Sequence, residues 1–324
     1  MAQSACTQNR FMDIIALLRN AADVSARGQL RRLIPAAALV FFIAALFAAG
    51  APQAPPRFAS AEKWAQGVKG VQLGLLILAV ASASVFLQPL LGFLAGVLQG
   101  SRRSFLAPVS ALLVGRYARS LARDQARWQE LASSLFRDDA SPTKTEVAEF
   151  QALDQSLIRS PSGRHLGPTR LSNVLIAANE QVSTRYGLDA DIAIPRLRVL
   201  APERAVAAYD ERQDDLRFAS DLTGALLLGV IVSLGLLILH PRYLWLPALI
   251  AALAWVSYRN ALTAAVRFAE AQLVLFDLYR FSLYDALQQT RPTSPREERR
   301  LGQEVTSLLW RGSDTEEPYV PPGT

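Results

Sequence analysis

Four long apolar runs without any charged residue constrain what this chain can fold into. They occupy residues 33–50, 71–99, 222–239 and 243–257. In the hydrocarbon core of a bilayer, every backbone N–H and C=O must be satisfied within the segment, so such runs are typical of membrane-spanning helices. The sequence therefore predicts an all-α integral membrane protein with four transmembrane helices, the last of which ends near residue 258.

Composition indicates that a large part of the chain lies outside the bilayer. Its residues are 51% hydrophobic and 19% charged, and its mean hydropathy is +0.18. The chain is therefore more apolar than an ordinary soluble protein, and it carries more charge than a protein that consists of transmembrane helices alone. In chain order, we expect a cytosolic amphipathic N-terminal helix (1–32), a transmembrane hairpin (33–100), a cytosolic helical domain (101–221), a second transmembrane hairpin (222–258), a cytosolic helical extension (259–311) and a disordered tail (312–324).

Basic residues orient the predicted spans. Residues 1–69 contain 8 Lys and Arg against 3 Asp and Glu, and most of the basic ones precede the first span. The residues that follow the second span include Arg102, Arg103, Arg116 and Arg119, whereas Arg242 alone lies between the last two. The positive-inside rule then places both termini and the middle domain in the cytoplasm of a bacterium, with the spans in its inner membrane. The segment Ala49-Gly50-Ala51 is similar to a signal cleavage site, but the 32 preceding residues favour an uncleaved span.

Helical periodicity continues outside the spans. Thr169 and Gly187 predict the two caps of one helix, and Pro202 predicts the first turn of another that runs into the third span. Residues 188–200 read as irregular, with a short extended stretch around Pro195. Further helices are expected at 10–26, 101–137, 145–158, 170–184 and 296–310, and the fourth span is expected to continue as a helix to Gln289. The extended helices should form a cytosolic bundle, while helix 10–26 could lie in the membrane interface or pack on that bundle.

The second run contains the most specific local pattern. Gln88 and Pro89 predict a kink, because proline interrupts the helical hydrogen bonds. Gly92, Gly96 and Gly100 follow at four-residue spacing, which lines one helix face with residues that allow close helix approach. This face could form an oligomer seam, line a pore at the kink, or pack within the chain against the first or third span.

Arginines 116, 119, 123 and 127 form a stripe at three- and four-residue intervals after the second span. We interpret the stripe as a helix face that meets either solvent or anionic lipid. Within it, Arg127 can pair with Asp124 or Glu130 at short helical spacing.

The sequence offers no recognisable catalytic chemistry. Its single cysteine, Cys6, excludes an internal disulfide, and its two histidines, His165 and His240, are expected on opposite sides of the membrane. The sequence contains no Cys/His metal cluster, nucleophile elbow, phosphate loop or dinucleotide fingerprint. We therefore expect that the protein binds neither a cofactor nor a metal and is not an enzyme. A nucleic-acid partner is not expected, because the net charge of +6 comes from the N-terminal part rather than from a basic domain.

Polar residues concentrate at the end of helix 170–184 and after it. They could tie a loop to the bundle as a satisfied polar network, or they could hold a ligand or an anion. The members are Asn173, Asn179, Glu180, Arg185, Tyr186, Asp189, Asp191, Arg196 and Arg198.

Part of this region resembles bacterial multi-pass membrane proteins of uncharacterised type. The similarity covers about 165–290 and includes Arg185-Tyr186-Gly187-Leu188-Asp189 and Pro195-Arg196-Leu197 before a membrane hairpin. It implies four spans and no particular activity. The layout alone, with both termini and a helical domain in the cytoplasm, is also similar to that of bestrophin-type channels, although no bestrophin motif is present.

Two functional hypotheses remain, with the lipid bilayer as a partner in both. In the first, the cytosolic helical module docks an unknown cytosolic protein or senses a state, without catalysis. In the second, the chain forms a homo-oligomeric ion channel or pore, because the spans lack ionisable residues and the second carries the glycine face.

Overall fold

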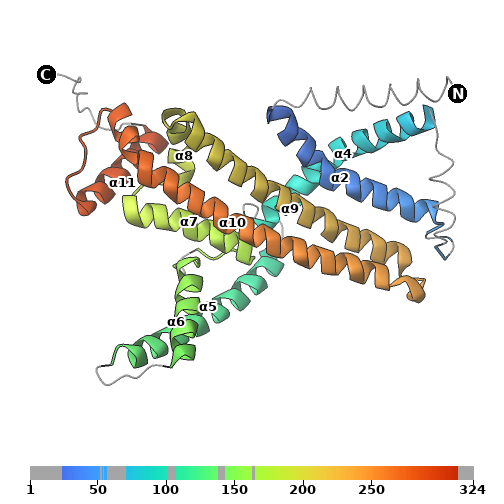
Figure 1. Ribbon diagram of the computed structural model, residues 1–324, viewed down its shortest axis with the longest axis horizontal. Helices are drawn as coiled ribbons and strands as arrows, with labels where there is room; N and C mark the ends of the chain where they lie inside the picture. Colours follow the sequence, from blue (N-terminus) through green and yellow to red (C-terminus); the bar gives the residue numbers. More distant parts are fainter. Residues whose placement is uncertain are drawn as a thin grey trace. The chain divides into compact units, whose positions relative to one another are not determined.

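The computed structural model describes residues 24–51, 53, 55–56, 71–100, 107–137, 143–162 and 165–312, and every regular element among them is a helix (Figure 1). Nine are α-helical and one is a short 3₁₀ turn. Their bounds are α2 Val24–Ala48, α4 Val71–Leu98, α5 Ala107–Leu135, α6 Lys144–Ile158, α7 Arg170–Tyr186, α8 Ala190–Leu200, α9 Glu203–Leu237, η1 Pro241–Tyr243, α10 Trp245–Ala286 and α11 Pro295–Arg311.

Three of the described helices are long and apolar enough to cross a membrane, as expected of a membrane protein. They contain Leu78–Leu98, Glu203–Leu237 and Pro241–Ala286. The predicted first span falls on α2, whose apolar part, Leu33–Ala48, is shorter than these. A fourth span therefore stays a prediction.

The chain forms two compact units. The first comprises residues 1–95 and 217–258, and the second comprises residues 96–216 and 259–324. Most of the predicted helix 10–26 and most of the predicted loop between the first two spans lie outside the described residues, as does the tail after Gly312.

Apolar side chains of α2, α4 and α9 form the core of the first unit. Leu39 of α2 and Leu91 of α4 are buried against Ala225 of α9. A second cluster joins Leu46 to Leu237, so both ends of the apolar part of α2 contact neighbouring helices. Small residues make these contacts possible, because a Cβ added at Gly224 would lie 3.3 Å from the Cβ of Leu94.

Helices α9 and α10 form the predicted hairpin. The break falls at His240-Pro241, where η1 begins with the proline that cannot continue the ladder of α9. Deeper between these helices, the hydroxyl groups of Thr223 and Ser257 lie 3.0 Å apart, and Thr223 also donates to the carbonyl of Ala219. Such a bond satisfies polar groups that would otherwise be exposed to hydrocarbon.

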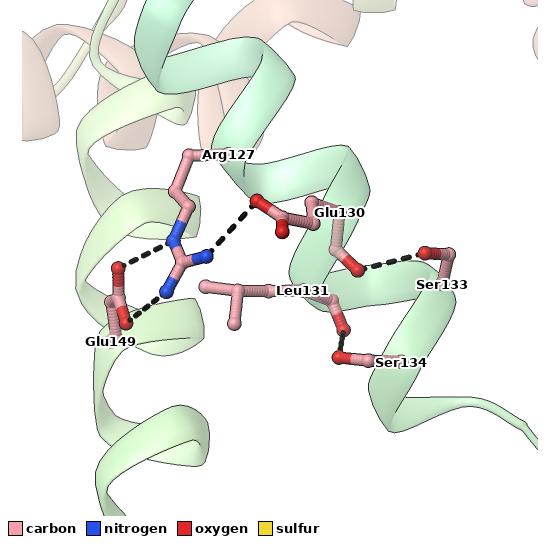
Figure 2. A network of polar contacts seen from close by, with 6 residues as sticks. All are labelled: Arg127, Glu130, Leu131, Ser133, Ser134 and Glu149. Carbon is pink, nitrogen blue, oxygen red and sulfur yellow. Dashed lines mark hydrogen bonds and ion pairs between the residues drawn. The ribbon is translucent and has the colours of Figure 1, made fainter.

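In the second unit, α5 and α6 form a hairpin that aromatic contacts and ionic contacts hold together; Figure 2 shows the ionic contacts. Trp128 stacks on Phe150 with ring centroids 5.6 Å apart, and its indole N–H donates to Asp154. Arg127 pairs with Glu130 as predicted, and it also reaches Glu149 on α6. The predicted helix 145–158 corresponds to α6, which begins one residue earlier, and a capping box of Thr143 and Glu146 forms its start.

Helix α7 has the two caps that the sequence predicts. Thr169 accepts from the backbone N–H of Ser172, and Gly187 ends the helix at φ 74°. This left-handed residue lies against α11, since a Cβ added at Gly187 would overlap the carbonyl oxygen of Arg299. The reciprocal residue is Gly302 of α11, which lies against the end of α7.

The expectation of an irregular segment at 188–200 is wrong. These residues form α8, with Asp189 as N-cap, and Asp189 accepts from the backbone N–H groups of Asp191 and Ile192. Ala190, Ala193 and Leu197 are buried at helical spacing, so tertiary packing outweighs the penalty of Pro195 inside the helix.

Candidate functional site

The predicted polar constellation separates into several smaller contacts within the second unit. In one, Asn179 of α7 bridges two helices. Its amide oxygen accepts from Gln272 of α10 at 2.8 Å, and its amide nitrogen donates to Asp191 of α8 at 3.3 Å. Burial and the neighbouring charge of Asp189 raise the pKa of Asp191, and the hydrogen bond from Asn179 acts in the opposite direction. Asn179 thus joins α7, α8 and α10.

A second contact centres on Tyr186 at the end of α7. Its hydroxyl donates to Asp277 of α10, and the guanidinium of Arg280 lies over its ring, 4.7 Å from the centroid. Arg280 also donates to Glu298 of α11 at 2.6 Å, and Glu298 is buried. Burial and then the bond to Asp277 raise the pKa of Tyr186. These groups connect α7, α10 and α11.

The other predicted members have local roles. Glu180 accepts from the backbone N–H of Ser162 at 2.6 Å, and Arg198 pairs with Asp210 of α9 at 2.8 Å. Asn173 is fully buried and exchanges two hydrogen bonds with Gly167. Arg185 and Arg196 are exposed, and Arg196 donates to the carbonyl of Ile192 in its own helix. This pattern supports the interpretation of a structural network over that of one ligand site.

Sequence reasoning missed the partners that complete these contacts. Gln272, Asp277, Arg280 and Glu298 come from helices about 90 or more residues away from most of the constellation. It also missed Tyr284, which is completely buried and whose hydroxyl has no hydrogen-bond partner among the described residues. Charged and polar residues on an amphipathic helix look alike in a sequence whether they face water or a neighbouring helix.

The three predicted glycines do not share one environment. Gly92 is exposed, and a Cβ added there would meet nothing within 4 Å, so it contacts neither the first nor the third span. Gly96 lies one turn later in α4. Gly100 follows the helix at φ 80°, where its missing Cβ gives room to Ser172. Gln88 is half-buried and Pro89 is exposed within the continuous helix α4.

An apolar groove on the second unit is a surface that the sequence did not indicate. It lies between α8 and the end of α10 and has a volume of about 560 Å³. Leu283 forms its floor, Val199 and Leu200 are exposed at its edge, and Arg196 adds a positive charge. Such a groove can bury the apolar face of a short helix.

Comparisons with known proteins give no information on the function of these surfaces. No family model matches the chain, and neither a curated protein nor a solved structure does. Among the residues that the structure describes, no group of three or more His, Cys, Asp or Glu side chains could hold a metal ion.

Proposed function

We propose that this protein is a membrane-anchored docking protein, whose second unit binds a protein partner in the groove between α8 and α10. The observation that carries this proposal is the apolar edge of the groove. Val199 is 84% exposed and Leu200 38%, beside the floor residue Leu283. An isolated exposed apolar residue needs no explanation, but neighbouring ones around a concave surface are typical of interaction sites.

Charge complementarity defines the partner further. Arg196 borders the groove, and among the described residues it donates only to a carbonyl of its own helix. A guanidinium in this position favours a carboxylate on the bound segment. The expected partner therefore presents a short amphipathic helix with an apolar face and an Asp or Glu at its edge. The basic residues that flank the predicted spans favour a cytoplasmic position for this unit.

The polar contacts of α7 support a non-catalytic role. Tyr186, Asn179 and Glu298 each bond to protein groups and hold neighbouring helices together. These three side chains are therefore committed to structural contacts.

The test compares capture of partners from native membranes by three full-length versions of the protein. They are the wild type, Val199→Asp, and Gln303→Asp as a matched control on the exposed face of α11. We expect at least one protein that is enriched by the wild type and the control but lost with Val199→Asp. Restoration of its capture by an added lysine on that protein's docking helix would establish the contact. Equal capture by all three versions, or no enrichment at all, contradicts the proposal.

The channel hypothesis keeps one specific observation in its favour. Gly92 faces open space on a helix whose most apolar window is only 17% buried within the chain. A glycine on such a face lets a helix of another copy approach closely. The native mass of the protein in nanodiscs tests this alternative. A ring of four or more copies that Gly92→Leu disrupts supports a pore, whereas a monomer or dimer leaves too few spans for one.

A further inference from the structure

A basic cleft lies at one end of α5, separate from the docking groove. It has a volume of about 990 Å³ and is formed by α5 together with the start of α7. Arg116, Arg119 and Arg123 contribute from α5, and Arg170 contributes from α7. The first three follow at intervals of three and four residues, which places them on one helix face.

None of these four arginines has a carboxylate partner among the described residues. Within the described part of the chain, Arg119 and Arg123 donate to the carbonyls of Gly115 and Arg119, one turn earlier in their own helix. By contrast, Arg127, the next member of the stripe, has two glutamate partners. The cleft thus concentrates four positive charges that form no ion pair with an acidic side chain among the described residues.

Two features indicate where a matching anion comes from. Leu112 and Leu113 line the same cleft and are 64% and 39% exposed, so an apolar surface adjoins the arginines. In addition, the cleft is attached to the end of a candidate span, because the hydroxyl of Thr169, next to Arg170, donates to the carbonyl of Leu98. Leucine beside arginine at the end of a span matches the headgroup region of a bilayer.

We infer that this cleft binds the phosphate headgroup of an anionic membrane lipid, with its acyl chains along Leu112 and Leu113. Arginine is suited to this role because its planar guanidinium donates two parallel hydrogen bonds to phosphate oxygens. The half-buried Tyr117 is already engaged with Ser160 at 3.1 Å, so we assign the phosphate contacts to the arginines alone.

The test measures lipids bound to the full-length protein by native mass spectrometry in detergent. Phosphatidylglycerol and phosphatidylcholine are the two probes, since both carry a phosphate but only the first has a net charge. A variant with Arg116, Arg119, Arg123 and Arg170 changed to Gln is compared with a matched control on α11. In the control, the exposed Arg296, Arg299, Arg300 and Arg311 are changed to Gln, which removes the same charge elsewhere.

We expect the wild type and the control to prefer phosphatidylglycerol, and the cleft variant to bind it at least about tenfold more weakly. The single variant Arg123→Gln, whose side chain is exposed, should weaken binding in the same direction and gives a result even if the fourfold variant fails to fold. Equal binding of both lipids, or equal losses in the cleft variant and the control, would overturn the inference.

A soluble phosphate ion is the alternative ligand for the cleft, because it carries the same group that the arginines would bind. Inorganic phosphate added at the concentration of the lipid should leave phosphatidylglycerol bound, because it cannot contact the two leucines. If it displaces the lipid, the cleft is a site for a soluble phosphate and the assignment to a membrane lipid is wrong.

Discussion

Arg127 of α5 donates two hydrogen bonds to the carboxylate of Glu149 on α6, from Nε at 2.8 Å and from a terminal nitrogen at 3.0 Å (Figure 2). Parallel donors from a planar guanidinium fix the orientation of the carboxylate as well as its distance. The two residues are 22 positions apart, so their contact determines how the α5–α6 hairpin closes rather than how either helix forms.

Replacing Arg127 with Lys should loosen this hairpin. The charge is kept, but a lysine cannot make the paired contact with Glu149. Because both side chains are partly exposed, the effect is modest, and we expect amide hydrogens of α6 to exchange about two- to fivefold faster. Hydrogen exchange followed by mass spectrometry measures this. Arg123→Lys is the control, since the hydrogen bond described for Arg123 goes to a carbonyl of its own helix. Identical exchange in both variants would show that the pair does not hold the hairpin.

The hairpin should also depend on pH. The hydrogen bond from Arg127 lowers the pKa of Glu149, and bonds from the backbone and side chain of Thr143 lower that of Glu146. A carboxyl whose pKa is lowered by folding stabilises the fold above its unfolded value, 4.5, and this contribution is lost as the pH falls through the lowered folded value.

Protection factors of α6, corrected for intrinsic exchange, should therefore be constant near neutral pH and decrease below about pH 4.5. Glu149→Gln removes one titrating group and should flatten the curve. An unchanged curve in that variant would mean that the ionisation of Glu149 does not contribute.

Local signals explain which helices the sequence could predict. Helix α7 was expected from Thr169 to Gly187, because its cap residues act on their own neighbours. The break at Pro241 follows from proline chemistry alone. Helix α8 was missed since Pro195 and the β-branched residues argue against a helix locally, and only the burial of Ala193 and Leu197 against other elements compensates.

The candidate surfaces depended on contacts that no local pattern contains. Tyr186 could be chosen as a polar residue near a helix end, but its partner Asp277 is 91 residues away. Similarly, the arginine stripe was evident in the sequence, whereas the cleft required Arg170 to come next to it from another helix. The sequence therefore indicated which residue types were candidates, but it could not predict which of them lie next to one another in the folded protein.

Two buried tyrosines should respond in opposite ways to the loss of a hydroxyl. Tyr186→Phe removes the donor to Asp277 and should cost about 1 kcal/mol of unfolding free energy. Tyr284→Phe removes a buried hydroxyl that has no partner among the described residues, so stability should stay unchanged or rise by about 1 kcal/mol. Thermal unfolding of both variants in the same detergent measures the difference. A clear destabilisation by Tyr284→Phe would show that this hydroxyl has a partner after all.

The contact between α7 and α11 should tolerate no added atom at Gly302. A Cβ there would overlap the carbonyl oxygen of Tyr186 and lie 3.0 Å from the carbonyl carbon of Gly187. Because backbone atoms cannot move aside as a flexible side chain can, Gly302→Ala should destabilise the protein by at least about 2 kcal/mol and lower its melting temperature. Gly115→Ala in α5 is the matched control, since its Cβ would meet nothing within 4 Å and alanine favours a helix. Equal melting temperatures for the two variants would mean that α11 can shift away from α7 without cost.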